Sequence, residues 1–133
     1  MNAFIVELEN RPGAMARVTE VLARRGVNLL VYGIGLGARG AIGFIANDEE
    51  RARSALKDAE ITYREVPVVH VRMEDQPGQA ASASRKLADA GVNIDVWLPV
   101  DTRPDSFTVA VGVDKVDAAR RALEGQLTTF TYR

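Results

Sequence analysis

Two short segments of the chain place an Asn or an Asp two residues before a Pro-Gly pair, just ahead of a predicted helix. The first is Asn10-Arg11-Pro12-Gly13, and Asp75-Gln76-Pro77-Gly78 repeats it. A helix N-terminus offers unpaired N–H groups and the positive end of the helix dipole, and a glycine lets a ligand approach the backbone. This arrangement suits a carboxylate. The alternative is structural: the polar side chain caps the helix and Pro-Gly shapes the turn.

A second polar position accompanies each segment. Asn28 and Asn93 each follow a Gly-Val at the end of the same predicted helix, where an otherwise apolar strand begins. A neutral amide carries both donors and acceptors, so Asn residues can bind both ends of a zwitterion. Asp75 would repel a carboxylate and attract an ammonium group. We therefore expect the first turn to favour a carboxylate more strongly than the second.

These positions recur because most of the chain recurs. Between Val6 and Val31, 11 of 26 positions are identical to the residue 65 places further on. Self-similarity over this length predicts two related structural units, which we place at residues 1–66 and 67–133. The offset widens to 67 at Leu123, the counterpart of Leu56, and we attribute the two extra residues to a longer turn at 101–105.

Hydrophobic periodicity predicts the element order βαββαβ in each half. The expected first half has strands at 3–8, 27–34, 41–46 and 61–66, with one helix opening at Pro12 and ending near Gly26 and another over 48–58. The expected second half has strands at 68–73, 92–100, 106–113 and 127–132, with helices at 77–90 and 115–123. Short, right-handed connections then give an antiparallel sheet with both helices on one face. The predicted fold class is α+β, with two tandem ferredoxin-like βαββαβ units.

Strand alternation assigns the side chains of the first half to two faces. The helix side is expected to take Phe4, Val6, Leu8, Val27, Leu29 and Val31. The open side is expected to take Ile5, Leu30, Tyr32 and Ile34, with Trp97 in the place of Tyr32 in the second half. An open face this apolar predicts packing against another sheet, within the chain or in a second copy. We therefore expect a homodimer.

Composition excludes several classes of function. The 133 residues are 47% hydrophobic and 26% charged with a net charge of −1, which is typical of a globular protein and does not favour nucleic acid. There is no cysteine, so disulfides and thiolate metal ligands are excluded. The chain contains no apolar run long enough for a membrane span, and its first residues lack the basic region of a signal peptide. A cytoplasmic location is expected.

Other motifs favour neither catalysis nor a cofactor. Gly35-Leu36-Gly37-Ala38-Arg39-Gly40 spells GxGxxG, but a strand rather than a helix is predicted after it, so a flexible hairpin turn is favoured over dinucleotide binding. His70 is the single histidine and has no predicted nucleophile or carboxylate partner. The βαββαβ order also occurs in RNA-binding sheets, but here the open face offers only Tyr32 or Trp97 among aliphatic residues, without a net positive charge. We predict no catalytic residue, no metal site and no cofactor.

The duplicated pattern of strand, [Asn/Asp]-x-Pro-Gly, helix and Leu-Ala-x-x-Gly-Val-Asn resembles tandem ACT-domain proteins over essentially the whole chain. The resemblance implies a regulatory module that binds amino acids between paired domains, using the turn after the first strand and the start of the second strand. By this resemblance, the ligand-binding positions expected in the first half are Asn10, Arg11, Pro12, Gly13, Ala14, Met15, Asn28 and Leu29. The matching ligand-binding positions expected in the second half are Asp75, Gln76, Pro77, Gly78, Gln79, Ala80, Asn93 and Ile94.

The sequence therefore predicts a non-catalytic, amino-acid-binding regulatory protein of amino-acid metabolism. ACT domains are often attached to enzymes, but this sequence leaves no room for a catalytic domain. A separate regulatory subunit that docks on a biosynthetic enzyme, as the small subunits of acetolactate synthase do, is the first alternative. A small enzyme on a ferredoxin-like scaffold ranks last, because no nucleophile–base pair is recognisable.

Overall fold

The computed structural model describes residues 1–133 and separates into two compact units, the first unit at Asn2–Glu65 and the second unit at Val66–Thr131. The elements of the first half are β1 (Asn2–Glu9), α1 (Ala14–Ala23), β2 (Leu29–Leu36), β3 (Arg39–Ala46) and α2 (Glu49–Asp58). Those of the second half are β4 (Arg64–Glu74), α3 (Gln79–Asp89), β5 (Ile94–Thr102), β6 (Ser106–Val113) and α4 (Val116–Ala122).

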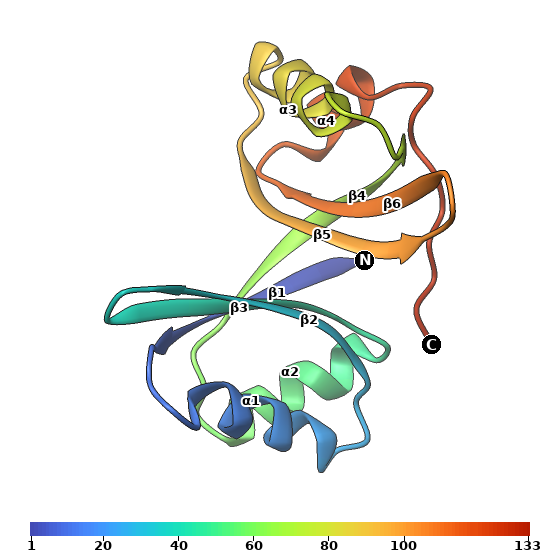
Figure 1. The fold of residues 1–133 in the computed structure, drawn as a ribbon. Coiled ribbons are helices and arrows are strands. Elements are labelled where there is room, and N and C mark those ends of the chain that lie inside the picture. The colour runs from blue at the N-terminus through green and yellow to red at the C-terminus, as the bar shows by residue number, and fades with distance from the viewer. The chain divides into compact units, whose positions relative to one another are not determined.

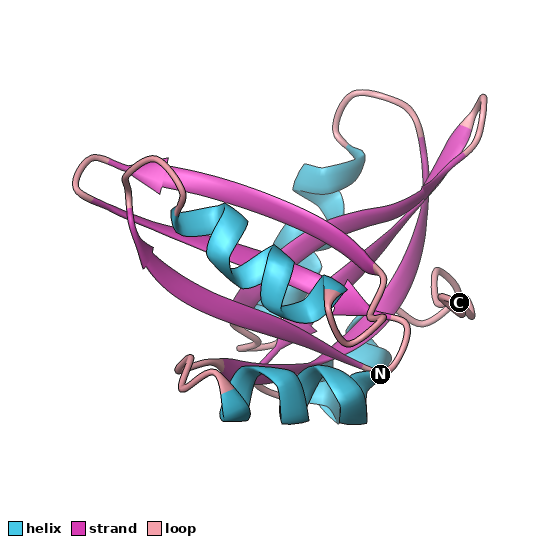
Figure 2. Cartoon of the chain, turned by 90° about the horizontal axis from the view of Figure 1, so that it is seen from below, coloured by secondary structure: helices cyan, strands magenta, loops and turns pink.

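Each half has the predicted α+β, ferredoxin-like arrangement of an antiparallel sheet with helices on one face. The strand order is β2-β3-β1 in the first half and β4-β6-β5 in the second. Helices α1 and α2 cover one face of the first sheet, and α3 and α4 cover one face of the second (Figure 1). The long strands and the short turns between them can be followed in Figure 2. Helix boundaries follow local signals, since Asp48 caps α2 by accepting a hydrogen bond from the Arg51 N–H at 3.0 Å.

A separate hydrophobic core lies between sheet and helices in each unit. In the first unit Phe4 and Phe44 stack with ring centroids 5.1 Å apart and pack among the buried side chains of Val18, Leu22 and Leu56. The second core is built mainly of valines on β4 and β6, with Leu87 and Leu123 from the helices. The helix-side residues predicted for the first half all face this core.

The fourth strand predicted for each half does not form as a separate element. Residues 61–63 have no regular structure, and β4 starts at Arg64 and continues unbroken into the strand predicted at 68–73. Residues 127–132 form only one isolated bridge, between Leu127 and Val71. Residues 64–66 therefore belong to the beginning of a longer strand, which continues through Pro67 into the strand predicted at 68–73.

Two β-bulges distinguish β5 from β2 and correct two predictions. Pairing shifts register between Ile94 and Val96 and again between Pro99 and Asp101, whereas β2 pairs with β3 without a break. Each bulge inserts one residue. The two bulges together account for the wider repeat offset, and the turn at 101–105 is not its cause. The Arg103 N–H donates to the Ser106 carbonyl at 2.8 Å, which leaves Pro104 and Asp105 as the counterparts of the two turn residues Gly37 and Ala38.

The first bulge also reverses the orientation of Trp97. Trp97 pairs with Val111 and packs against the helix-side core, so its structural counterpart is Val31 and not Tyr32. The prediction that Trp97 lies on the open face was therefore wrong, because one inserted residue exchanges the two faces of a strand. Tyr32 and Ile34 do lie on the open side, where they are 44% and 62% exposed.

Candidate functional site: a glycine-lined cleft at the first Pro-Gly turn

The two Pro-Gly turns have nearly the same backbone. Gly13 and Gly78 are the N-cap residues of α1 and α3, with φ angles of 87° and 91°. This left-handed conformation favours glycine, and a side chain at either position would meet nothing within 4 Å. The helices begin at Ala14 and Gln79, two residues later than predicted from the prolines. Neither helix has a side-chain cap, so the capping interpretation of Asn10 and Asp75 was wrong.

The Asn10 side chain instead joins the first turn to the β2–β3 hairpin. Its Nδ2 group donates to the Gly37 carbonyl at 2.8 Å, and its backbone N–H donates to the Ala38 carbonyl at 3.0 Å. Gly37 has a φ of 70° and is one of the two residues between the strands. Asn10 thus fixes the entrance to α1 against the tip of the hairpin.

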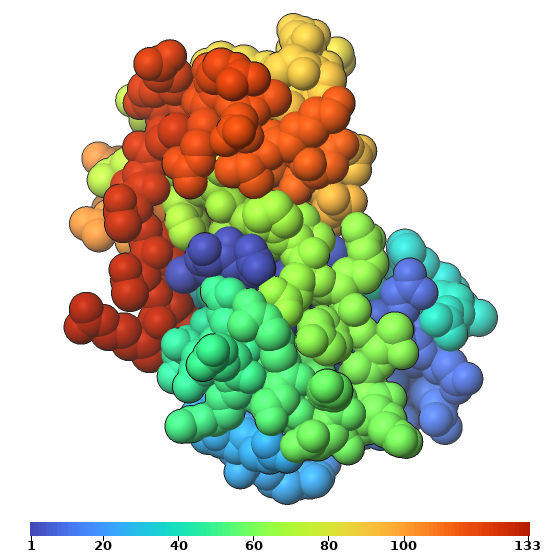
Figure 3. All heavy atoms as spheres, turned by 180° about the vertical axis from the view of Figure 1, so that it is seen from behind, coloured from blue at the N-terminus to red at the C-terminus, as the bar shows by residue number.

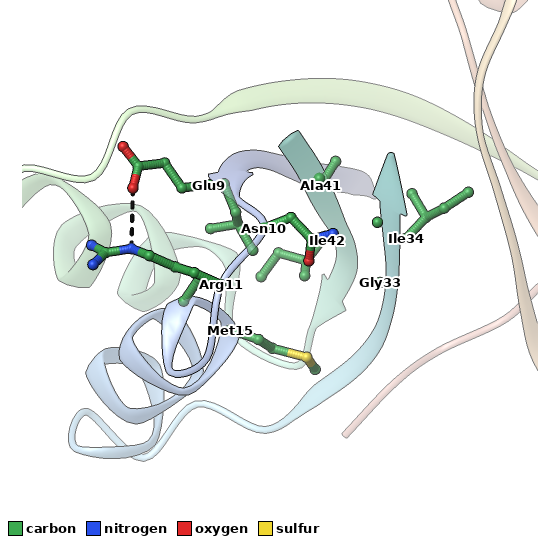
Figure 4. Close-up of a pocket in the computed structure, with 12 residues that line it drawn as sticks. Glu9, Asn10, Arg11, Met15, Gly33, Ile34, Ala41 and Ile42 are labelled. Atoms are coloured by element: carbon green, nitrogen blue, oxygen red, sulfur yellow. Dashed lines mark ion pairs between the residues drawn. The ribbon is translucent and has the colours of Figure 1, made fainter. Parts of the chain in front are cut away.

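A cleft of about 300 Å³ opens between this turn, the start of α1 and the hairpin (Figure 4). Such a volume is at the lower end of the range for small-molecule sites. Its lining residues are Leu8, Glu9, Asn10, Arg11, Ala14, Met15, Gly33, Ile34, Gly35, Gly40, Ala41 and Ile42. In Figure 4 the side chains of Asn10 and Met15 extend toward the strands, while Arg11 pairs with Glu9 at 3.1 Å. Four predicted positions therefore line one cleft, namely Asn10, Arg11, Ala14 and Met15.

Glycines on the hairpin create the space for this cleft, and the sequence analysis did not assign them to a site. A Cβ atom at Gly35 would lie 2.7 Å from Asn10 Nδ2, and one at Gly33 would lie 3.4 Å from Ile42. Gly33 and Gly35 are strand residues, so the GxGxxG segment is a hairpin in which only Gly37 and Ala38 form the turn. The unusual spacing of glycines within a strand was the signal for a close approach.

The other predicted residues of the first half lie elsewhere. Pro12 and Gly13 shape the turn without lining the cleft. Asn28 and Leu29 lie at the opposite end of β2, where the Asn28 N–H donates to Asn47 Oδ1 at 2.9 Å and the Asn47 N–H returns a bond to the Asn28 carbonyl. Within one unit, Asn10 and Asn28 therefore do not meet.

The second turn has different surroundings. Its backbone is anchored like the first, since the Asp75 N–H donates to the Asp105 carbonyl at 3.0 Å. However, the residues that correspond by register to Gly33 and Gly35 are Pro99 and Thr102. Gln76, Pro77 and Gly78 complete the turn and Ala80 lies in the first turn of α3, while Gln79 lines a different cleft.

Asn93 and Ile94 are remote from the second turn, as Asn28 is from the first. The Asn93 N–H donates to Asp114 Oδ1 at 2.9 Å, and its side chain donates to Asp95 at 3.2 Å. Ile94 is the first residue of β5 and pairs with Val113. The asparagine after each Gly-Val thus anchors the start of a strand in both units.

His70 lies on the open face of the second sheet, because its neighbours Val69 and Val71 face the core. Its ring lies 5.6 Å from the Phe130 ring, and its buried Nε2 atom has no hydrogen-bond partner. Burial lowers the pKa of His70, and the positive charges of the amino terminus and Arg120 lower it further. No group of three or more His, Cys, Asp or Glu side chains forms a possible metal site in the chain.

Two ferredoxin-like units with matching Pro-Gly turns indicate a duplicated module, and sequence comparison identifies its family. The family model described as an ACT domain pair matches residues 1–100. The chain belongs to this family.

Solved structures resemble the chain over nearly its whole length. A protein from Bacteroides thetaiotaomicron is 25% identical with a TM-score of 0.77, and the match covers 96% of this chain and 90% of that one. The regulatory subunit of aspartate kinase from Thermus thermophilus, in its ligand-free form, is 22% identical with a TM-score of 0.63, covering 94% and 91%. None of the curated proteins that were compared matches the sequence. None of the four helices combines the length and apolar character that a membrane-spanning helix needs.

Proposed function

We propose that the chain is a non-catalytic regulatory protein that binds an amino acid at the first Pro-Gly turn. The observation that carries this proposal is the cleft in which Asn10, the start of α1 and three hairpin glycines converge. The Ala14 N–H donates to the Arg11 carbonyl at 3.2 Å, but α1 has no side-chain cap, so the N–H groups of Met15 and Ala16 remain as donors for a carboxylate. Membership of the ACT domain pair family supports an amino acid as the ligand.

A second copy of the chain would bring Asn28 to the cleft. Strand β2 is the outer strand of the first sheet, and it contains no charge, no proline and no bulge. Its open-side residues Tyr32, Ile34 and Leu36 are 44%, 62% and 68% exposed. Unprotected edge strands of this kind pair readily with another strand.

Antiparallel pairing of β2 with the same strand of a second copy, centred on Tyr32, would place the partner's Asn28 beside Leu36. Leu36 adjoins the glycine-lined end of the cleft. Asn10 of one copy and Asn28 of the other would then face the same cleft in a homodimer, in agreement with a ligand bound between paired domains. In contrast, β5 carries Pro99, two aspartates and two bulges, which protect an edge.

The experiment first screens the twenty amino acids by thermal shift, because a ligand that binds only the native state raises its stability. Calorimetry then compares Gly13→Val with Gly78→Val. Both glycines have left-handed φ angles and open space around them, so the backbone strain is matched. We expect Gly13→Val to weaken binding of the identified amino acid at least tenfold and Gly78→Val to have the smaller effect. If both variants fold and bind as tightly as the parent chain, the turns are structural only.

A regulatory subunit of a separate biosynthetic enzyme is the second candidate. The specific observation in its favour is that the chain covers 91% of the Thermus thermophilus aspartate kinase regulatory subunit, a protein of the same architecture. Affinity purification of the tagged chain from its own cells, with and without the identified amino acid, separates the candidates. A stoichiometric metabolic enzyme in the eluate supports a subunit, and elution of the chain alone supports a free-standing sensor.

A further inference from the structure

The second unit contains another cleft, at the edge of β4. It lies where the C-terminal segment, defined as Gly125–Thr128, runs beside β4 on the surface of the molecule (Figure 3). Two backbone hydrogen bonds hold the segment, from the Arg72 N–H to the Gln126 carbonyl at 2.8 Å and from the Thr128 N–H to the His70 carbonyl at 3.0 Å. Pairing stops there, and the cleft of about 520 Å³ opens beyond it.

The open edge of β4 directs a backbone donor into this region. Successive residues of a strand turn their N–H groups to opposite edges. The Asp75 N–H bonds to Asp105 on the β6 side, whereas the Arg72 N–H bonds to the C-terminal segment. The N–H of Glu74 therefore points to the same edge as that of Arg72, past the last residue that the segment pairs with.

Two side chains add donors to the same cleft. The Arg72 guanidinium is exposed, forms no ion pair, and has one hydrogen bond, to Ser106 Oγ at 3.3 Å. A guanidinium has five N–H groups, so most of its donors are available. Gln126 Oε1 accepts from Lys86 Nζ at 2.9 Å, which leaves the NH₂ end of the amide for a ligand. Gln79, at the start of α3, also lines the cleft.

The corresponding cleft of the first unit has a more acidic lining. It lies between β1, α1 and the chain after α2, has a volume of about 290 Å³, and is lined by Glu7, Glu9 and Glu60. Glu7 is the counterpart of Arg72 in the repeat. The two basic residues there are already engaged, Arg11 with Glu9 at 3.1 Å and Arg17 with the Ala59 carbonyl at 3.3 Å. The second-unit cleft therefore keeps one of the three acidic residues, as Glu74, and has the unpaired donors of Arg72 in place of Glu7.

We propose that the cleft beside the C-terminal segment binds a small organic monocarboxylate. The Arg72 guanidinium holds the two carboxylate oxygens in the bidentate geometry that this pair favours, and the Gln126 amide and the Glu74 N–H donate to the same group. The Glu74 side chain, on the same strand face as Arg72, repels a second negative charge, which selects a monoanion over phosphate. This site is separate from the cleft at the first turn.

The test is an NMR titration of the full chain with sodium propionate at constant ionic strength, following backbone amides. We expect saturable shifts at Glu74 and Gln126 in the parent chain. Arg72→Glu copies the first-unit residue and is expected to weaken binding at least tenfold. Arg121→Glu makes the same charge change at an exposed position of α4 outside the cleft, and is expected to leave the dissociation constant within about twofold because distant exposed charges are screened.

Three outcomes overturn the proposal. Equal losses of propionate affinity in Arg72→Glu and Arg121→Glu would show that the effect is general charge attraction. Unchanged affinity in Arg72→Glu would show that the guanidinium takes no part in binding. Tighter binding of phosphate than of propionate would contradict the selection by Glu74. Arg72→Gln, which keeps an uncharged polar side chain, must also bind weakly, which guards against misfolding of the charge-reversed variant. Because Gly13→Val leaves this cleft intact, it should titrate as the parent does even if the first turn binds nothing.

Discussion

The two Pro-Gly turns share a backbone but face different strands. Gly13 and Gly78 have φ angles within a few degrees of each other, at 87° and 91°. Beside the first turn, Gly33 and Gly35 keep β2 clear of side chains, whereas Pro99 and Thr102 occupy the same register positions in β5. The difference shows that a duplicated turn keeps its shape through local backbone requirements, while the cleft beside it depends on residues contributed by a neighbouring hairpin.

The largest effect on amino-acid affinity is expected from adding a side chain at Gly35 of β2. In Gly35→Ala the new Cβ atom would lie 2.7 Å from Asn10 Nδ2, so Asn10 must leave the Gly37 carbonyl and enter the cleft. We expect amino-acid affinity to fall more than tenfold. The free energy of unfolding should fall by ~1 kcal/mol, the typical net contribution of one hydrogen bond. Calorimetry gives the affinity and urea unfolding gives the stability.

Thr102→Ala is the matched control for Gly35→Ala, because it changes the corresponding residue of β5. It should leave affinity unchanged. An unchanged affinity in Gly35→Ala as well would mean that the glycine-lined cleft takes no part in binding.

The two halves also differ in how the second helix is tied to the sheet. Arg53 of α2 forms ion pairs with Glu65 and with Glu49, the latter at 3.2 Å, and Asn2 Nδ2 donates to Glu65 at 2.9 Å. The hydrogen bond from Arg53 is the main cause that lowers the pKa of Glu65. The counterpart of Arg53 in α4 is Arg120, which has no ion pair.

Glu65→Gln is therefore expected to destabilise the chain by ~1–2 kcal/mol at neutral pH. This value is the usual contribution of hydrogen bonds to charged groups, lowered because the ion pair is partly exposed. Arg120→Gln should change stability by less than ~0.5 kcal/mol, as for other surface substitutions. Because the folded-state pKa of Glu65 is lowered, its contribution is present above the unfolded-state pKa and disappears as the pH falls through the folded value. Urea unfolding at pH 7 and pH 3 should show the difference between parent and Glu65→Gln shrinking in acid.

Sequence reasoning recovered those features that local signals determine. The Pro-Gly turns, the helix over 48–58 and the helix-side residues of the first half follow from residue type and periodicity. The bulges in β5 could not be found this way, because residues 96–100 form a continuous apolar run in which no alternation assigns a side chain to either face. As a result Trp97 was assigned to the wrong face. The contact between Asn10 and Gly37 spans 27 residues, and no periodic signal reports a pairing of that kind.

A smaller effect is expected from exchanging the polar residues of the two turns. Asn10→Asp replaces the donor to the Gly37 carbonyl with an anion, so it should weaken binding of an amino-acid carboxylate several-fold. Asp75→Asn removes an anion from the start of α3 and should leave the first site unchanged. Calorimetry on both variants and on the double variant measures these effects. Stronger carboxylate binding in Asn10→Asp would contradict the assignment of the helix N-terminus to the carboxylate.

The smallest effect concerns His70, whose counterpart in the first half is Ile5. The pKa of His70 is lowered from 6.5, chiefly by burial, so between the folded and unfolded values the unfolded chain binds more protons. Stability must then rise with pH through this window and level off above the unfolded value. Acidification from pH 7 toward pH 5 should therefore destabilise the parent chain more than His70→Ile, by the order of 1 kcal/mol or less. His70→Ile gives the second sheet the residue that the first sheet has at Ile5. Equal slopes of unfolding free energy against pH in the parent chain and in His70→Ile would show that the histidine ring is solvated in the native state.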